Sequence, residues 1–222
     1  MTSSSRAEAG RGARGINWKI GLTSRTMPMA LNITTPDSGV LLGDLQFAGG
    51  ATVPKGRFIQ ARVEAEIAFL MRADLARAVV TRDDVIAATG HAAPSLEILD
   101  TRILRTDPAT GTPRRNFDTL ADNAGIVLGV QRHPITAQDL RWTPAIVKRD
   151  GVVEETGLGA GVLDDPVTGI LRLAHRLTAF GQGLSAGDIG LSGSFIRPIE
   201  ASPGSRFHAD FGAFGQVSQS FA

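Results

Sequence analysis

The segment RVEAEIAF, residues 62–69, constrains the fold and the chemistry of this chain more than any other stretch. Side chains alternate along a strand, so Glu64 and Glu66 share one face with Ala68, and the opposite face is apolar. Two neighbouring carboxylates on a mostly apolar element repel each other unless a cation or hydrogen-bond donors offset the repulsion. A divalent metal is one solution. The other is a half-buried strand that presents its acids to water, and a lone E-x-E spacing does not decide between them.

A third carboxylate, Glu97, lies in the apolar segment SLEILD, residues 95–100. A glutamate without a partner is costly in such surroundings. It could pair with an arginine such as Arg102 at a strand edge, or it could join Glu64 and Glu66. In the second case three hard oxygen ligands meet without Cys or His, a set that suits Mg²⁺ or Mn²⁺ and disfavours zinc.

Composition excludes several classes of function. At 222 residues the chain is long enough for one domain with a real core, and a formal net charge of +1 gives no basic excess for a nucleic-acid surface. The absence of cysteine excludes disulfides and a thiolate nucleophile, and is compatible with a reducing cytosol. The sequence contains no P-loop, G-x-G-x-x-G or G-x-S-x-G motif, and no apolar run approaches the roughly 18 residues that span a bilayer. We therefore expect a cytoplasmic protein without nucleic-acid or membrane partners.

Domain organisation follows from the first residues. Residues 1–16 are rich in Ser, Gly, Ala and Arg and contain no large apolar side chain between Met1 and Ile16. Such a segment cannot bury enough surface to offset its ordering entropy, so the composition predicts a disordered tail. Residues 17–222 are predicted to form a single catalytic domain.

Two helices and a hairpin carry clear local signals. Thr81 is suited to cap the start of a helix that Gly90 would end. Asp150-Gly151, between alternating apolar arms, predicts a two-residue hairpin turn. Asp165-Pro166 is suited to start a second helix that Gly181 would end. The apolar period of this second helix predicts a buried stripe of Ile170, Leu173, Ala174, Leu177 and Phe180.

From Gly187 onward, short apolar runs alternate with turns of Gly, Ser and Pro, which predicts an antiparallel β-rich core. Within this region Ser194, with Ser192 and Gly193, could present hydroxyl and backbone N–H groups to an anionic ligand. A tight turn is an equally good interpretation of the same three residues.

Lys19 lies between Trp18 and Ile20, so its ammonium enters an apolar neighbourhood unless the strand turns it outward. Near carboxylates, such a lysine can donate a proton or stabilise negative charge. From position alone, a solvated lysine at a strand edge is the preferred interpretation. Asp37, in the segment TPDSG, is similarly preferred as a turn residue, with a site carboxylate as the alternative.

Residues 101–118 form the longest stretch without a clear period, and an irregular loop of this length is usually functional or disordered. Arg102 and Arg115, together with Arg105 and Arg114, could bind a carboxylate of a substrate or could be solvated.

Eight segments together carry a family resemblance. They are KIGLTS (19–24), TPDSGVLL (35–42), RVEAEIAF (62–69), SLEILD (95–100), FDTLADNAG (117–125), EETG (154–157), AGDIGLSGSF (186–195) and FHADFG (207–212). In this combination the chain resembles the hydratase and decarboxylase branch of the fumarylacetoacetate hydrolase superfamily. The resemblance implies an α+β fold, a mixed and mostly β roll with peripheral helices, and a homo-oligomer.

The resemblance also assigns the site. It implies that Glu64, Glu66 and Glu97 bind Mg²⁺ or Mn²⁺, and that Lys19 and Asp37 transfer protons. The metal would chelate the carboxylate and the 2-oxygen of a small-molecule 2-hydroxy-2,4-dienoate and stabilise its negative charge. Water would then add to the resulting 2-oxo-enoate.

The long loop is most similar to that of the hydratases of homoprotocatechuate degradation, whose substrate carries a second carboxylate. Arg102, Arg115 and Ser194 are the candidate substrate-binding residues. A decarboxylase of the 4-oxalocrotonate type is the alternative, because loss of CO₂ leads to the same kind of enolate.

Two departures from the family pattern motivate a third hypothesis. Family members carry several tens of helical residues before the KIG motif, where this chain has 18 residues. The stretch after Asp122-Asn123-Ala124 is also about three residues shorter than the family pattern. A shortened family member that folds but catalyses poorly is therefore a further alternative.

Overall fold

A computed structural model describes residues 15–21, 38–77, 79–101, 109–111 and 122–222. Three of the predicted site residues, Asp37, Arg102 and Arg115, lie outside the described residues. The first strand begins at Gly15.

Short strands dominate the described chain and two α-helices accompany them. The strands are β1 (Gly15–Ile20), β2 (Ser38–Leu42), β3 (Gln46–Phe47), β4 (Thr52–Val53), β5 (Ala61–Met71), β6 (Thr89–Asp100), β7 (Asn123–Leu128), β8 (Pro144–Arg149), β9 (Val152–Leu158), β10 (Ile189–Leu191), β11 (Ile199–Glu200), β12 (Arg206–Asp210) and β13 (Gln216–Phe221). The helices are α3 (Arg82–Ala88) and α4 (Pro166–Thr178), with 3-10 turns η1 (Gly43–Leu45), η3 (Leu140–Trp142), η4 (Gly159–Gly161) and η5 (Gly212–Phe214).

The strands form two sheets. The larger has eight strands in the order β2-β1-β10-β5-β6-β7-β3, with β11 also paired to β5, and the smaller has the order β4-β13-β12-β8-β9. Most neighbours are antiparallel, as predicted for the C-terminal region. The pairs β1–β10 and β4–β13 are parallel, which corrects that prediction where C-terminal strands meet strands from the start of the chain.

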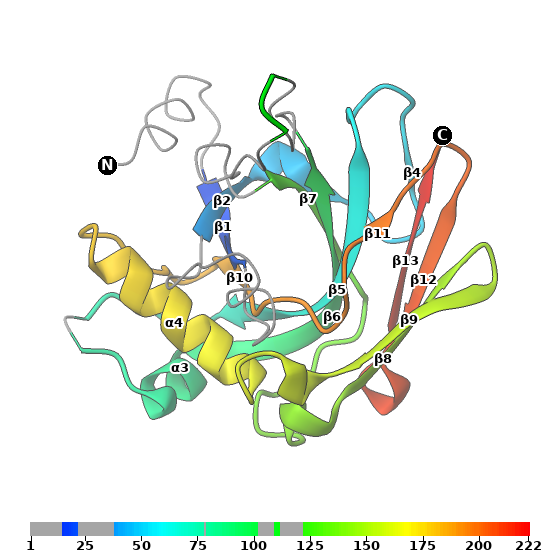
Figure 1. Cartoon of the computed structure of the whole chain (residues 1–222). Coiled ribbons are helices and arrows are strands. Elements are labelled where there is room, and N and C mark those ends of the chain that lie inside the picture. Colours follow the sequence, from blue (N-terminus) through cyan, green and yellow to red (C-terminus); the bar gives the residue numbers. More distant parts are fainter. Residues whose placement is uncertain (1–14, 22–37, 78, 102–108, 112–121) are drawn as a thin grey trace.

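The larger sheet curls until its two ends meet. Strands β2 and β3 lie at opposite ends of the strand order, yet only the three residues of η1 separate them in the chain. The Asn123 side chain on β7 also donates a hydrogen bond to the Val40 carbonyl on β2. In Figure 1 these strands accordingly surround a common interior, and the sheet has an inner and an outer face.

The outer face of this curled sheet carries the main apolar core. Val63, Ile67 and Phe69 of β5 are fully buried there and belong to one cluster with Val147 of β8 and Phe207 of β12. The smaller sheet therefore packs against the outer side of β5 and β6, while α3 and α4 cover the neighbouring part (Figure 1). A separate, smaller apolar cluster contains Leu41, Ala68, Ile126, Ile189 and Leu191.

The predicted helix starts and the hairpin are confirmed. Thr81 forms a capping box with Asp84, and the Asp165 side chain accepts a hydrogen bond from the Val167 N–H at 2.9 Å. Asp150 and Gly151 both have positive φ, 53° and 84°, as a two-residue hairpin turn between β8 and β9 requires.

The predicted helix ends needed correction. Helix α3 ends at Ala88 and Gly90 lies in β6, because Thr89 already adopts extended geometry and pairs with Met71. Helix α4 ends at Thr178, so Phe180 falls outside the buried stripe and is 41% exposed. The other four residues of the predicted stripe are buried.

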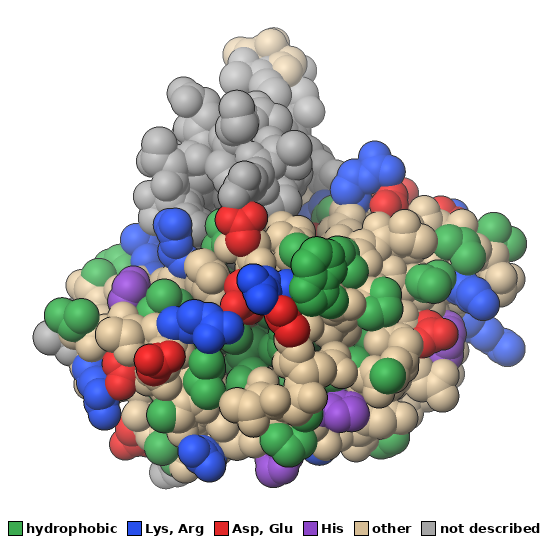
Figure 2. Space-filling view, turned by 90° about the horizontal axis from the view of Figure 1, so that it is seen from below, with side chains coloured by type: hydrophobic (Ala, Val, Ile, Leu, Met, Phe, Trp, Pro, Cys, Tyr) green, Lys and Arg blue, Asp and Glu red, His purple; other side chains and the backbone are tan. Residues whose placement is uncertain are grey.

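The surface mixes charge types. On the face shown in Figure 2, acidic and basic side chains lie close together among apolar ones. The described helices are too short or too polar to cross a membrane.

Candidate metal centre

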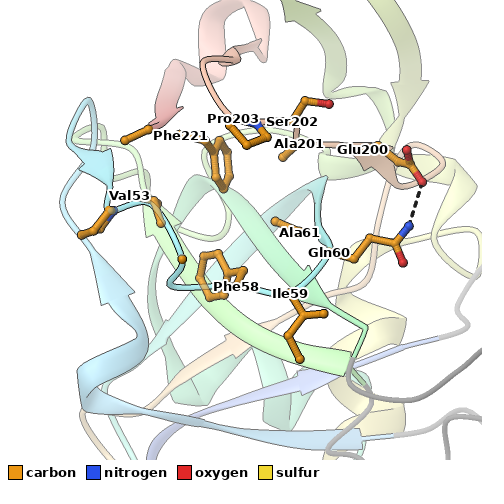
Figure 3. A pocket seen from close by; sticks show the side chains of 13 residues that line it. Val53, Phe58, Ile59, Gln60, Ala61, Glu200, Ala201, Ser202, Pro203 and Phe221 are labelled. Carbon is orange, nitrogen blue, oxygen red and sulfur yellow. Dashed lines mark hydrogen bonds between the residues drawn. The ribbon is translucent and has the colours of Figure 1, made fainter.

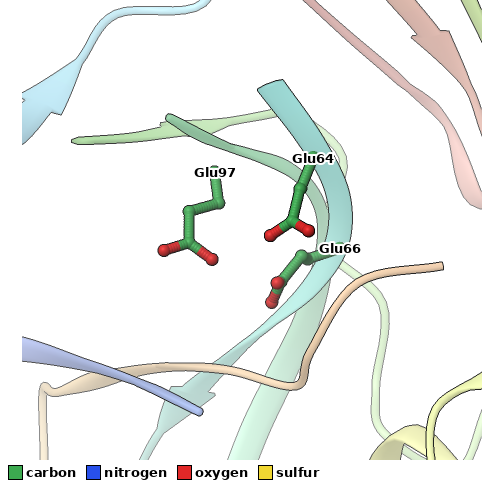
Figure 4. A group of neighbouring side chains, drawn as sticks. All are labelled: Glu64, Glu66 and Glu97. Atoms are coloured by element: carbon green, nitrogen blue, oxygen red, sulfur yellow. The ribbon is translucent and has the colours of Figure 1, made fainter. Parts of the chain in front are cut away.

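Register places the three glutamates together. In the antiparallel β5–β6 pair, Glu64 lies directly opposite Glu97, and Glu66 lies one alternation further along β5 on the same face, opposite Ser95. One carboxylate oxygen from each glutamate lies within 4.8 Å of the others. Figure 4 shows the three carboxylates pointing into the space that the curled sheet surrounds. Glu66 is 1% exposed, so the interpretation of a solvated strand acid is wrong for this residue, and Glu97 is equally buried.

Lys19 reaches this cluster from a distant strand. Strands β10 and β5 separate β1 from β6 in the sheet, a span of about 14 Å along a flat sheet. The Lys19 ammonium nevertheless lies 2.9 Å from Glu97 Oε1, because the curled sheet brings its inner face together. Lys19 is 3% exposed, so the solvated position preferred from sequence alone was wrong. Lys19 is thus a partner of Glu97, and the suggested partner Arg102 lies outside the described residues.

The electrostatic state of Glu66 reflects its surroundings. Burial raises the pKa of the Glu66 carboxyl group well above its ordinary value, and the charges of Glu97 and Glu64 raise it further. The Gly193 N–H, which donates a hydrogen bond to Glu66 Oε2 at 2.8 Å, lowers the same pKa, as does Lys19. The cluster therefore holds more negative charge than the nearby donors compensate.

The chemistry of this donor set fits a hard divalent cation. Two buried carboxylates and the half-buried Glu64 contribute oxygen only, and neither Cys nor His belongs to the cluster that the described residues form. Such a set is typical of Mg²⁺ or Mn²⁺ sites that keep positions open for substrate or water. A bound cation would also relieve the repulsion that raises the pKa of Glu66.

Comparison with known proteins agrees with this geometry. The chain is 44% identical over 206 residues to the 2-oxo-hept-4-ene-1,7-dioate hydratase of Escherichia coli, an alignment of 91% of this chain and 77% of that protein. It is 35% identical over 220 residues to 2-keto-4-pentenoate hydratase 1 of Dechloromonas aromatica, covering 98% of this chain and 81% of the relative. The chain belongs to the family of these 2-oxo-hept-4-ene-1,7-dioate and 2-keto-4-pentenoate hydratases. No protein-family model matches it.

A solved structure extends the similarity to the fold. The 4-oxalocrotonate decarboxylase of Pseudomonas putida G7, complexed with magnesium and adipate, superposes with a TM-score of 0.89 at 26% identity. The superposition covers 98% of this chain and 82% of the decarboxylase. The predicted fold class is thereby confirmed: a mostly β, curled sheet with peripheral helices.

Of the predicted substrate-binding residues, only Ser194 is described. Its hydroxyl donates to the Ile196 carbonyl at 2.8 Å and accepts from the Ile196 N–H at 3.2 Å, so it closes a local turn. In this hydratase-branch fold, the donor of the S-G-S segment that faces an anion is the Gly193 backbone, and the anion is the Glu66 carboxylate. An anionic ligand bound by this segment stays a prediction.

Sequence reasoning missed Arg62. Its guanidinium donates to Asp122 Oδ2 at 2.9 Å and to Thr101 Oγ1 at 3.2 Å, and so joins the end of β6 to the start of β7. A period of two from Glu64 could have placed Arg62 on the inner face. Nothing local, however, indicates that Thr101 and Asp122 meet there.

A separate pocket lies away from the carboxylates (Figure 3). Its volume is about 230 Å³, and Phe58, Phe221 and Pro203 line it together with a Gln60–Glu200 hydrogen bond of 3.2 Å. None of the three glutamates lines this pocket, so it is distinct from the candidate metal centre.

Proposed function

We propose that this chain is a metal-dependent hydro-lyase that adds water to a 2-hydroxy-2,4-dienoate or its 2-oxo-enoate tautomer in the degradation of aromatic compounds. The observation that carries the proposal is the cluster of Glu64, Glu66, Glu97 and Lys19 on the inner face of the sheet, in a chain 44% identical to a 2-oxo-hept-4-ene-1,7-dioate hydratase. The seven-carbon dicarboxylate is accordingly the proposed substrate.

The proposed metal ligands are Glu64, Glu66 and Glu97, with Mg²⁺ or Mn²⁺ as the ion. When bound, the ion supplies Lewis-acid stabilisation of negative charge on the 1-carboxylate and 2-oxygen of the substrate. The chain contributes a rigid carboxylate set, since all three ligands stand on two long, paired strands.

Lys19 and Asp37 are the proposed proton-transfer residues. Hydration requires the 2-hydroxyl proton to leave, a proton to arrive at C5, and water to add at C4 of the resulting α,β-unsaturated 2-oxo acid. The Lys19 ammonium lies on the inner face within hydrogen-bond distance of Glu97, a position from which it can hold or deliver a proton. Arg102, Arg115 and Ser194 are the proposed partners of the substrate carboxylates.

A 4-oxalocrotonate decarboxylase is the second candidate, favoured by the TM-score of 0.89 with the solved decarboxylase. Its test is CO₂ release from 4-oxalocrotonate.

We further propose that residues 17–222 form one catalytic domain of a cytoplasmic homo-oligomer. Light scattering measures the mass of the assembly in solution, which gives the number of subunits.

The decisive experiment follows the ultraviolet absorbance of 2-hydroxyhepta-2,4-dienedioate in the presence of Mg²⁺, with the product identified by mass. We expect loss of the diene and gain of one water, and at least a hundredfold slower decay for Glu64→Ala, since metal-site changes commonly cost about 10–100-fold even beyond the ligands. Glu154→Ala, an exposed strand glutamate on β9, is the matched control and should keep full activity.

Two results would contradict the proposal. Full activity in EDTA would exclude a metal role. Metal binding without any diene loss would favour a family member that folds and binds metal but catalyses poorly.

A further inference from the structure

The chain bulges beside Glu66 where it continues from β10. The Ser192 N–H donates to the Ile67 carbonyl at 3.1 Å, and the Phe195 N–H donates to the Ala65 carbonyl at 2.9 Å. On β5 only Glu66 separates these two acceptors, whereas Gly193 and Ser194 separate the two donors. Two residues opposite one define a β-bulge, a feature that frees backbone groups from the ladder and often lies next to active sites.

The freed backbone group turns to the metal centre. The Gly193 N–H donates to Glu66 Oε2 at 2.8 Å, and both residues are buried. Gly193 has a φ of 103°, a region that residues with a side chain adopt only under strain. Glycine therefore permits the turn that aims this N–H at the carboxylate.

The bulge is also supported from outside. Helix α4 approaches so closely that a Cβ atom on Gly169 would lie 2.0 Å from the Ser192 carbonyl oxygen. Ser194 closes the other side of the bulge through its two hydrogen bonds to Ile196. The Gly193 N–H thus lies between α4 on one side and the Ser194–Ile196 turn on the other.

We propose that Gly193 is a positioning residue of the metal centre: the β-bulge aims its N–H at Glu66 and fixes the orientation of that carboxylate for a divalent cation. The inference rests on the proposed metal site. A hydrogen bond to a ligating carboxylate restricts its rotation, so the ligand need not be ordered when the metal binds. Loss of such a bond typically weakens metal affinity by about 10–100-fold.

The test compares two glycines at opposite ends of the same strand. Gly193→Ala introduces a side chain at φ 103° and displaces the N–H from Glu66, whereas Gly187→Ala introduces a similar strain at φ 91° in an open, exposed turn before β10. Titration with Mn²⁺, followed by calorimetry, measures affinity, and thermal melting of the metal-free proteins measures strain. We expect Mn²⁺ affinity to fall about 10–100-fold in Gly193→Ala and to change less than twofold in Gly187→Ala. Equal Mn²⁺ affinities for the two variants would overturn the inference.

Hydrogen exchange gives a second test that does not need the Gly193 variant to fold. In metal-free protein, exchange over residues 192–195 should be faster in Glu66→Ala than in wild type, and unchanged in Glu64→Ala, which removes a ligand without touching the Gly193 hydrogen bond. Unchanged protection in Glu66→Ala would contradict the inference.

If the wild type bound no Mn²⁺, the proposed function would fail. If it bound Mn²⁺ and Gly193→Ala matched Gly187→Ala, only the role of Gly193 would fail.

Discussion

The two faces of β5 differ in what each contributes to the protein. On the outer face, Val63, Ile67 and Phe69 are fully buried in an apolar core between the two sheets. On the inner face, the alternating positions carry Glu64 and Glu66, whose carboxylates meet Glu97 from the paired strand. Packing holds the outer face together, whereas the inner face gathers like charges that only cations and N–H donors offset.

This difference teaches that the site is stabilised by the rest of the fold. Apolar burial contributes roughly 25 cal/mol per Å², and the outer core is built from it. The inner cluster opposes folding because burial raises the pKa of Glu66. Changes on the outer face should therefore affect stability alone, and changes on the inner face should affect stability in a way that a metal ion can reverse.

The largest effect is expected from the outer face. Phe69→Ala removes a fully buried ring and should lower the free energy of unfolding by about 3–5 kcal/mol. Urea denaturation measures this loss of stability. Phe180→Ala is the control: the Phe180 side chain is 41% exposed, so the variant should lose less than about 1 kcal/mol. The Mn²⁺ affinity of the folded Phe69 variant should equal that of the wild type; a large loss would show that the two faces are not separable.

Lys19→Met tests the inner face. It leaves Glu97 buried without the ammonium that lies 2.9 Å away, and should destabilise the metal-free protein by about 3 kcal/mol. Saturating Mn²⁺ should recover most of this loss, because the ion supplies the missing positive charge. Lys55→Met, at an exposed lysine, should change neither quantity. Failure of Mn²⁺ to stabilise the Lys19 variant would argue against a cation at the cluster.

A smaller effect is expected in the pH dependence of stability. The pKa of Glu66 is raised in the folded state above its ordinary value of 4.5, so the folded protein holds this proton more tightly than the unfolded chain. Its contribution is fully present below pH 4.5 and is lost as pH rises through the folded-state pKa. Metal-free wild type should therefore lose stability across that window, and Glu66→Gln should lose less. Denaturation at a series of pH values measures both slopes; equal slopes would exclude Glu66 as the source.

The smallest effect is expected at the start of α4, on the outer side of the sheet. Asp165→Ala removes the cap to the Val167 N–H and the contact to Arg82, and should cost about 1 kcal/mol of stability. Thermal melting measures the loss. Mn²⁺ affinity should not change, and a parallel loss of affinity would mean that α4 transmits strain to the bulge at Ser192.

Local chemistry was sufficient for much of the fold. The caps Thr81 and Asp165, the Asp150-Gly151 turn and the alternation of β5 depend on residues within a few positions of one another, and all are present in the structure. The end of α3 was misjudged because Thr89 pairs with Met71, eighteen positions earlier. Pairing between distant residues decided that boundary, and propensity could not reveal it.

The candidate site, too, could be predicted only in part from local sequence. The sequence by itself determined that Glu64 and Glu66 share a face, because strand alternation is a property of the backbone. Only the tertiary structure decided that Lys19 faces Glu97, and that the Gly193 N–H faces Glu66. The first contact depends on the curling of the larger sheet, and the second depends on the bulge after β10. These result from the closure of many strands at once, and no single segment encodes them.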